Sequence, residues 1–146
     1  MSDASTTFRT KCRVTYAHCT VGNHVYYSRY LDLLEAARGE FFRELGSPLA
    51  ALQEADTIFP VIGMTLNFKS PARYDDVLTI ELSISEMSGV RLTFASRILS
   101  QNGALLAEGE TRHVCATPAE KPKRLPKELM EKLRPFVVAG QVQNPA

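Results

Sequence analysis

From Val14 to Leu45 the sequence reads VTYAHCTVGNHVYYSRYLDLLEAARGEFFREL, and this stretch decides the fold. It begins like the end of a strand, passes through a glycine-containing turn and continues as a long helix. Apolar side chains recur at steps of three and four residues along the helical part, at Leu34, Ala37, Phe41 and Leu45. Gly46 follows, where a left-handed backbone can end a helix. The apolar stripe is wide, so the pattern predicts a helix that another layer must cover.

The turn before this helix has unusual conformational freedom. Gly22 and Asn23 both tolerate positive φ angles, which favours a tight entry into the helix. We expect the helix to start between His24 and Ser28. The first N–H groups of a helix lack partners within it, so here they would face the turn and form a site for a negatively charged oxygen.

Alternating apolar and polar side chains predict five strands that supply the covering layer. They span Phe8–Tyr16, Ile62–Lys69, Leu78–Ser85, Leu92–Ile98 and Leu105–Ala116. Ser88-Gly89 and Asn102-Gly103 are typical of hairpin turns. Small residues in the last strand, Ala107 and Gly109, indicate close approach by another backbone. The order of elements predicts an α+β fold, in which an antiparallel sheet curls around one central helix.

The sequence predicts less regular secondary structure in the remaining segments. Residues 46–61 suggest a loose connection, and Pro126–Phe136 reads as a short amphipathic helix after a proline- and lysine-rich connector. We expect residues 1–7 to be frayed and the tail after Val138 to be disordered. The whole chain, residues 1–146, is thus expected to form a single domain with a core at about 8–117.

Composition narrows the functional classes. The formal net charge of +1 gives no global field for nucleic acid or an anionic membrane. Three cysteines without CxxC spacing make a poor disulfide framework and indicate a reducing compartment. The sequence has no apolar run of membrane-spanning length and no signal-peptide core. We therefore expect a cytoplasmic protein without nucleic-acid or membrane partners.

Several segments together carry a family resemblance. They are Val14-Thr15-Tyr16, Gly22, Val25-Tyr26-Tyr27, Tyr30-Leu31, Glu35 with Ala37-Arg38, Phe68 to Asp76, Leu92-Thr93-Phe94, Asn102-Gly103, Leu106-Ala107-Glu108 and Pro122 to Pro126. In this order and spacing, over about residues 8–136, the chain resembles the hotdog-fold acyl-CoA thioesterases of the 4-hydroxybenzoyl-CoA thioesterase-like family. The resemblance implies a homodimer, often paired into a homotetramer, with active sites at the subunit interface. It also implies an acyl-CoA or acyl-carrier protein thioester as substrate and no metal or redox cofactor.

The chain departs from the family at the centre of this turn. Members usually carry an aspartate there, in a D-x-D-x-x-G type turn, as nucleophile or general base. Alignment on Gly22 places Thr20 at that aspartate and His18 at the earlier acidic position. A threonine hydroxyl has no ionised form near neutral pH, so it cannot replace a carboxylate base unaided.

Three functions are compatible with this departure. In the first, which we favour, the protein hydrolyses the thioester with a water that Thr20 positions. The helix N-terminus and the Tyr27 N–H polarise the thioester carbonyl, and His24 or Glu35 acts as base. In the second, the protein binds an acyl thioester without cleaving it. In the third, it is a hydratase or dehydratase in which His24 is the acid–base group.

Each candidate catalytic residue also has a structural alternative. Thr20 can cap a turn, and His24 can be a hydrogen-bonded interface side chain. The Tyr27 ring can belong to the core or a pocket wall. Glu35 can form an ion pair with Arg38, three residues later on the helix.

Substrate contacts are expected from two kinds of residue. Gly22 and Val25 belong to the matched turn, and Lys69, Arg73 and Arg91 are cations suited to coenzyme A phosphates, although such side chains are more often solvated. Phe59, Met64, Leu66 and Phe94 are expected to set the length of the acyl pocket. His18, His113 and the cysteines match no zinc spacing, so we expect no metal site.

Overall fold

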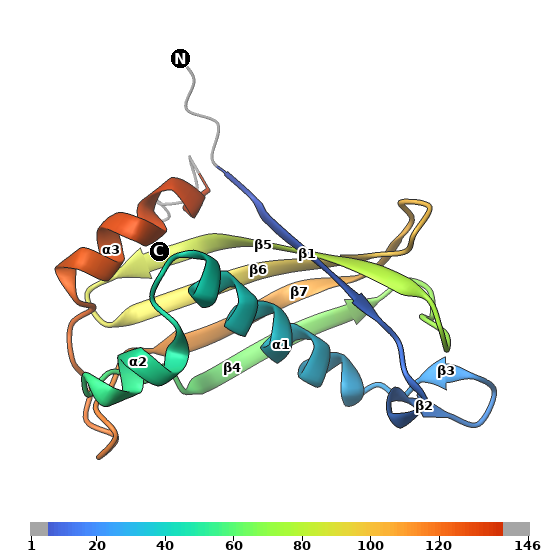
Figure 1. The fold of residues 1–146 in the computed structure, drawn as a ribbon, viewed down its shortest axis with the longest axis horizontal. Coiled ribbons are helices and arrows are strands. Elements are labelled where there is room, and N and C mark those ends of the chain that lie inside the picture. The colour runs from blue at the N-terminus through green and yellow to red at the C-terminus, as the bar shows by residue number, and fades with distance from the viewer. Residues whose placement is uncertain (1–5, 139–146) are drawn as a thin grey trace.

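The computed structural model describes residues 6–138 as an antiparallel sheet that wraps around one long helix (Figure 1). The elements are β1 (Phe8–Arg13), η1 (Tyr16–His18), β2 (Cys19–Thr20), β3 (His24–Val25), α1 (Arg29–Glu44), α2 (Leu49–Glu54), β4 (Val61–Phe68), β5 (Val77–Ser88), β6 (Arg91–Leu99), β7 (Leu105–Val114), α3 (Lys127–Leu133) and η2 (Arg134–Phe136). This is the helix-in-sheet arrangement that the sequence predicts.

The main sheet has five strands in the order β1-β5-β6-β7-β4, and each neighbouring pair is antiparallel. β4 therefore lies at one edge and β1 at the other. The predicted close approach occurs where β7 meets β4: a Cβ atom on Gly109 would lie 2.8 Å from the Leu66 Cα. Only glycine fits there, because the obstacle is backbone that cannot turn aside.

The core lies between α1 and the concave face of the sheet. Phe41 of α1 is 1% exposed, and its ring centroid is 5.2 Å from Phe8 of β1, 5.7 Å from Phe94 of β6 and 4.8 Å from Phe136. Burial of such a side chain stabilises the fold by about 1.5–3 kcal/mol. The helix thus holds the first strand, the sheet centre and the C-terminal segment together.

The convex face of the sheet is charged instead of apolar. Register places Arg9, Glu81, Arg97 and Glu108 side by side across β1, β5, β6 and β7. Glu81 accepts hydrogen bonds from Arg9 Nε at 2.8 Å and from Arg97 at 2.9 Å. We name this set of four residues the charge row.

Three elements differ from the sequence predictions. β1 ends at Arg13 instead of Tyr16, because Tyr16 begins the η1 turn. α1 starts at Arg29, one residue after the predicted range, and Ser28 is its N-cap. Residues 46–61 are not only a loose connection, since α2 forms within them. Its alanine- and leucine-rich run favours a helix, but six residues are too few to show a clear period.

The ends of the described chain lie close together. The Thr6 N–H donates to the Pro135 carbonyl and the Val138 N–H to that of Ile84, both at 2.8 Å. Thr6 is therefore ordered, contrary to the expected fraying of residues 1–7; residues 1–5 and the tail beyond Val138 lie outside the described residues. Within residues 6–138, no helix has the length and apolar character needed to cross a bilayer.

Candidate active site

The turn that aligns with the family's catalytic segment forms a small β-hairpin next to the start of α1 (Figure 1). Thr20 of β2 lies directly opposite His24 of β3, and the loop between them uses positive φ angles of 84° at Gly22 and 64° at Asn23. The His24 imidazole lies over the loop, since a Cβ on Gly22 would be 3.9 Å from its Nε2. The structure therefore brings three predicted site residues together on one exposed hairpin.

The loop of residues 70–76 is joined to this hairpin by hydrogen bonds. The Val25 N–H donates to the Ala72 carbonyl at 2.9 Å, and the Tyr74 N–H donates to Asn23 Oδ1 at 3.3 Å. Val25 itself is 5% exposed and packs into the core. Its place is thus structural, and the predicted contact with substrate stays a prediction.

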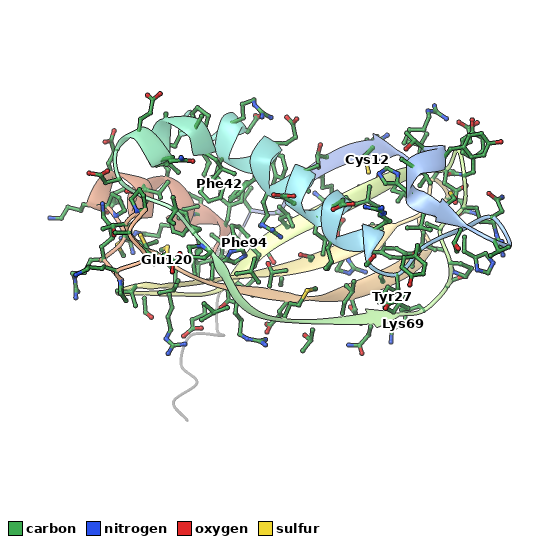
Figure 2. The ribbon with its side chains drawn as sticks, turned by 90° about the horizontal axis from the view of Figure 1, so that it is seen from below. Cys12, Tyr27, Phe42, Lys69, Phe94 and Glu120 are labelled. Carbon is green, nitrogen blue, oxygen red and sulfur yellow. The ribbon has the colours of Figure 1, made fainter. Side chains whose placement is uncertain are left out.

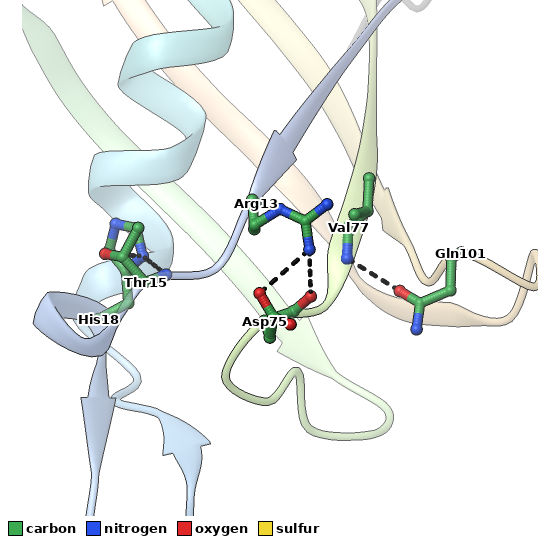
Figure 3. Close-up of polar contacts among 6 residues, drawn as sticks. All are labelled: Arg13, Thr15, His18, Asp75, Val77 and Gln101. Atoms are coloured by element: carbon green, nitrogen blue, oxygen red, sulfur yellow. Dashed lines mark hydrogen bonds and ion pairs between the residues drawn. The ribbon is translucent and has the colours of Figure 1, made fainter.

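The entry to the hairpin is fixed by local polar contacts (Figure 3). The Thr15 N–H donates to His18 Nδ1 at 3.1 Å, which fixes the imidazole within the η1 turn. The Arg13 guanidinium donates to the Asp75 carboxylate at 3.1 Å and to its backbone carbonyl at 3.0 Å. His18, at the family's earlier acidic position, therefore has a structural partner in this chain.

The start of α1 presents fewer free donors than the sequence suggests. The N–H groups of Arg29, Tyr30 and Leu31 already donate to carbonyls of the preceding three residues. Tyr27 and Ser28 remain, and among the described residues neither backbone N–H has a hydrogen-bond acceptor. The backbone N–H groups that are free to donate to a substrate carbonyl oxygen are therefore those of the two residues that precede the helix.

The two aromatic side chains at this entry are paired with each other. The Tyr26 and Tyr27 rings lie 4.7 Å apart, and a side-chain hydrogen bond to Tyr27 raises the pKa of Tyr26. Tyr27 is 64% exposed, so its ring belongs to the surface of the protomer instead of its core.

The predicted cations lie in two places. Arg73 forms a β-bridge with His24. Lys69 directly follows Phe68 at the end of β4, and the Phe68 ring lies 5.0 Å from that of Tyr30 at the start of α1; Figure 2 labels Lys69 and Tyr27 at this end of the molecule. Arg91 begins β6 and pairs with Val114 at the opposite end of the sheet. Only Lys69 and Arg73 are thus placed with the hairpin.

Glu35 also lies away from the hairpin. It lines a pocket of about 330 Å³ between α1, α2 and the beginning of β4, together with Arg38, Gln53, Phe59, Phe94 and His113 among others. Figure 2 shows Phe42 and Phe94 between α1 and the sheet on the side of this pocket. We name it the Arg38 pocket. Phe59 and Phe94, both expected to shape an acyl site, are in its wall, whereas Met64 and Leu66 are not.

The predicted Glu35–Arg38 ion pair is not formed: no carboxylate among the described residues lies within 4.0 Å of the Arg38 guanidinium. Burial lowers the pKa of Arg38, and the nearby charge of Glu35 partly offsets this effect. Arg38 nevertheless keeps its positive charge at neutral pH.

His113 is a residue whose position sequence reasoning did not anticipate. It is 2% exposed, with Nδ1 3.0 Å from the Phe59 carbonyl and Nε2 3.0 Å from Thr111 Oγ1. A carbonyl can only accept, so Nδ1 carries the proton and Nε2 accepts from the hydroxyl. Burial lowers the pKa of His113 to about 4, so the ring is neutral at pH 7. Both nitrogens are occupied, which makes His113 a structural part of the pocket wall.

No group of three or more His, Cys, Asp or Glu side chains within residues 6–138 is arranged to hold a metal ion. The hairpin instead offers a hydroxyl, an imidazole and free backbone donors. Such groups can orient water, accept a proton and stabilise a developing oxyanion.

Comparison with known proteins decides the family. Residues 14–133 match the family model of the thioesterase-like superfamily. The chain belongs to this superfamily. Acyl-CoA thioester hydrolase YbgC from Escherichia coli is 36% identical over 131 residues, which cover 89% of this chain and 98% of that protein. Acyl-CoA thioesterase YbgC from Haemophilus influenzae is 31% identical over 119 residues, covering 80% and 87%.

Similar solved structures confirm the hotdog fold. A hypothetical protein from Thermus thermophilus superposes with a TM-score of 0.82 at 34% identity, covering 88% of this chain and 98% of that one. A probable thioesterase from Bartonella henselae gives 0.78 at 31% identity, covering 83% and 100%. This hotdog protein thus has the family scaffold with Thr20 at the turn.

Proposed function

We propose that this hotdog protein hydrolyses acyl-CoA thioesters to a free acid and coenzyme A. The observation that carries the proposal is the Thr20–His24 pair on a hairpin beside the free N–H groups of Tyr27 and Ser28. Relatives named acyl-CoA thioester hydrolases, matched over nearly their whole length, support the substrate class.

The proposed reaction begins with attack by water on the thioester carbonyl. The Thr20 hydroxyl orients the water, His24 takes one of its protons, and the Tyr27 N–H donates to the carbonyl oxygen as it becomes negative. Collapse of the tetrahedral intermediate breaks the C–S bond, and the leaving thiolate receives the proton from His24. A thioester is already an activated acyl group, so the proposal uses no metal or redox cofactor.

Glu35 is a weaker candidate for the base. It lies eight residues beyond Tyr27, which corresponds to about 12 Å along α1. It lines the Arg38 pocket, whose wall does not include Thr20. Lys69 and Arg73 are the proposed phosphate contacts, because they flank the hairpin.

We further propose a homodimer that forms through β4. β4 is an edge strand with one unpaired side, and Val61, Ile62 and Phe68 along it are 48%, 55% and 49% exposed. Pairing with a second copy would satisfy the backbone groups of that edge and cover these side chains. A tetramer would need two such dimers to stack through apolar faces. The convex face of the sheet is charged, so the structure supports the tetramer less than the dimer.

The test is thiol release from a panel of short, long and aromatic acyl-CoA thioesters, with an acyl-carrier protein thioester included. We expect kcat/KM to fall by about 100-fold in His24→Ala and about 10-fold in Thr20→Ala. Thr79→Ala, on the convex face of β5, is the matched control and should keep parental activity. If both hairpin variants keep full turnover, the reaction does not use this hairpin.

A second candidate is a non-catalytic acyl-thioester binding protein. The observation that favours it is the lack of any acidic residue from Val14 to Tyr30, which includes the whole hairpin. Binding of an acyl-CoA without thiol release from any thioester of the panel would select this alternative.

A further inference from the structure

The Arg38 pocket has the size and lining of a ligand site. Its volume of about 330 Å³ lies within the range of small-molecule sites. Phe42 and Phe59 form one wall as a stacked pair with centroids 5.7 Å apart and an angle of 23°. Aromatic walls of this kind accept an aliphatic or planar group.

The charges around the pocket are unequal. Arg38 is half-buried and has neither an ion-pair partner within 4.0 Å nor a hydrogen-bond partner among the described residues. Lys123 adds positive charge behind the wall, since its Nζ donates to Thr57 Oγ1 at 3.0 Å. Glu35 is the opposing charge, and it is exposed at the pocket rim. Gln53 and the neutral His113 contribute no charge.

The guanidinium of Arg38 is partly shielded from water by the pocket and has no protein carboxylate beside it, so a bound carboxylate could accept two parallel hydrogen bonds from it. We propose that the Arg38 pocket binds the far end of the acyl group and that Arg38 recognises a carboxylate there. The inference rests on the proposed acyl-CoA function. It assigns the enzyme a preference for acyl groups that end in a carboxylate over those that end in a methyl group.

The position of β4 explains how the pocket and the hairpin can share one substrate. β4 begins at Val61, in the pocket lining, and ends at Phe68, whose ring lies 5.0 Å from Tyr30 at the start of α1. Antiparallel pairing of two β4 strands would therefore bring the hairpin of one protomer towards the Arg38 pocket of the other. The hairpin and the pocket that share one substrate would then come from different protomers.

The experiment compares matched acyl-CoA pairs: succinyl with butyryl, adipyl with hexanoyl and suberyl with octanoyl. For the parent protein we expect kcat/KM to be at least 10-fold higher for the carboxylate-ended member of one pair. Arg38→Met should abolish or reverse that ratio. Arg43→Met, the same change on an exposed arginine of the same helix, should leave the ratio unchanged.

Binding without turnover separates this inference from the proposed function. Calorimetry measures the binding of two analogues that cannot be hydrolysed. The parent should bind S-(5-carboxypentyl)-CoA at least 10-fold more tightly than S-hexyl-CoA, whereas Arg38→Met should bind the two analogues with equal affinity. Glu35→Gln should tighten the binding of the carboxylated analogue about 3-fold, because it removes the opposing charge. If Arg38→Met does not fold, this variant tests the carboxylate site in its place. Preferential binding without hydrolysis supports the pocket while refuting the enzyme. Hydrolysis without any preference, or a preference that survives Arg38→Met, overturns the carboxylate site.

Discussion

The Tyr30 hydroxyl accepts a hydrogen bond from the Ala72 backbone N–H at 3.1 Å, where both residues are buried. This bond joins the first turn of α1 to the loop that supports the hairpin. Ala72 also accepts the Val25 N–H at 2.9 Å. Helix start, loop and hairpin are therefore held as one unit, although they are far apart in the sequence.

Tyr30→Phe should destabilise the protein by about 1–3 kcal/mol, because it leaves the buried Ala72 N–H without an acceptor. Urea unfolding measures this difference. Tyr74→Phe is the control, since the Tyr74 side chain is 40% exposed and its change should cost little. Equal stability of the two variants would mean that water replaces the Tyr30 hydroxyl.

Thr20→Asp should raise thioester hydrolysis about 10-fold or more, because it adds a carboxylate base opposite His24. Thr20→Asn has nearly the same shape without the charge and should not show this gain. The rates are compared by thiol release at pH 7. A loss of activity in Thr20→Asp would show that the hydroxyl itself is required.

His113 predicts a loss of stability in mild acid. Its folded pKa is about 4, compared with an ordinary value of 6.5. Below pH 6.5 the His113 imidazole therefore binds a proton in the unfolded chain but stays neutral in the folded protein. The free energy of unfolding thus decreases by up to about 3 kcal/mol as the pH falls from 6.5 to 4.

Urea unfolding at several pH values checks this prediction against His113→Asn, which cannot titrate in that range. The variant should show a smaller change in stability between pH 6.5 and 4 than the parent. Parallel pH profiles for the two proteins would assign the acid sensitivity to other groups.

Gly109→Ala should prevent folding or cost several kcal/mol, because the new Cβ meets the β4 backbone at Thr65 and Leu66. Gly39→Ala is the control on α1, where a Cβ has no heavy atom within 4 Å. That change should stabilise the helix by about 0.5–1 kcal/mol. Thermal melts of the two variants should therefore move in opposite directions.

Ile62→Glu should weaken the proposed dimer, since it puts a charge in place of an exposed apolar side chain of the β4 edge that the second copy would cover. Lys11→Glu, on the opposite edge strand β1, should leave the assembly unchanged. Sedimentation velocity at matched concentrations distinguishes the two outcomes. A dimer that tolerates Ile62→Glu would place the interface elsewhere.

Much of the fold follows from local pattern. The stripe on α1 and the alternation along β5 correctly predict buried faces, since Leu34, Phe41, Leu78 and Ile80 are each at most 1% exposed. The Arg38 pocket could not be predicted, because it forms where α1, α2 and β4 meet and α2 has too few residues to show a period. The role of His113 could not be predicted either, because it depends on the Phe59 carbonyl, which only folding brings within 3.0 Å of Nδ1.

The charge row implies that variation at these positions is coupled. Glu81 lies between Arg9 and Arg97, and Arg97 lies between Glu81 and Glu108. Replacing Glu81 alone would leave two arginines facing each other across a neutral position, which is unfavourable for cross-strand neighbours. Over evolutionary time, relatives that lose this glutamate are therefore expected to lose at least one flanking arginine as well.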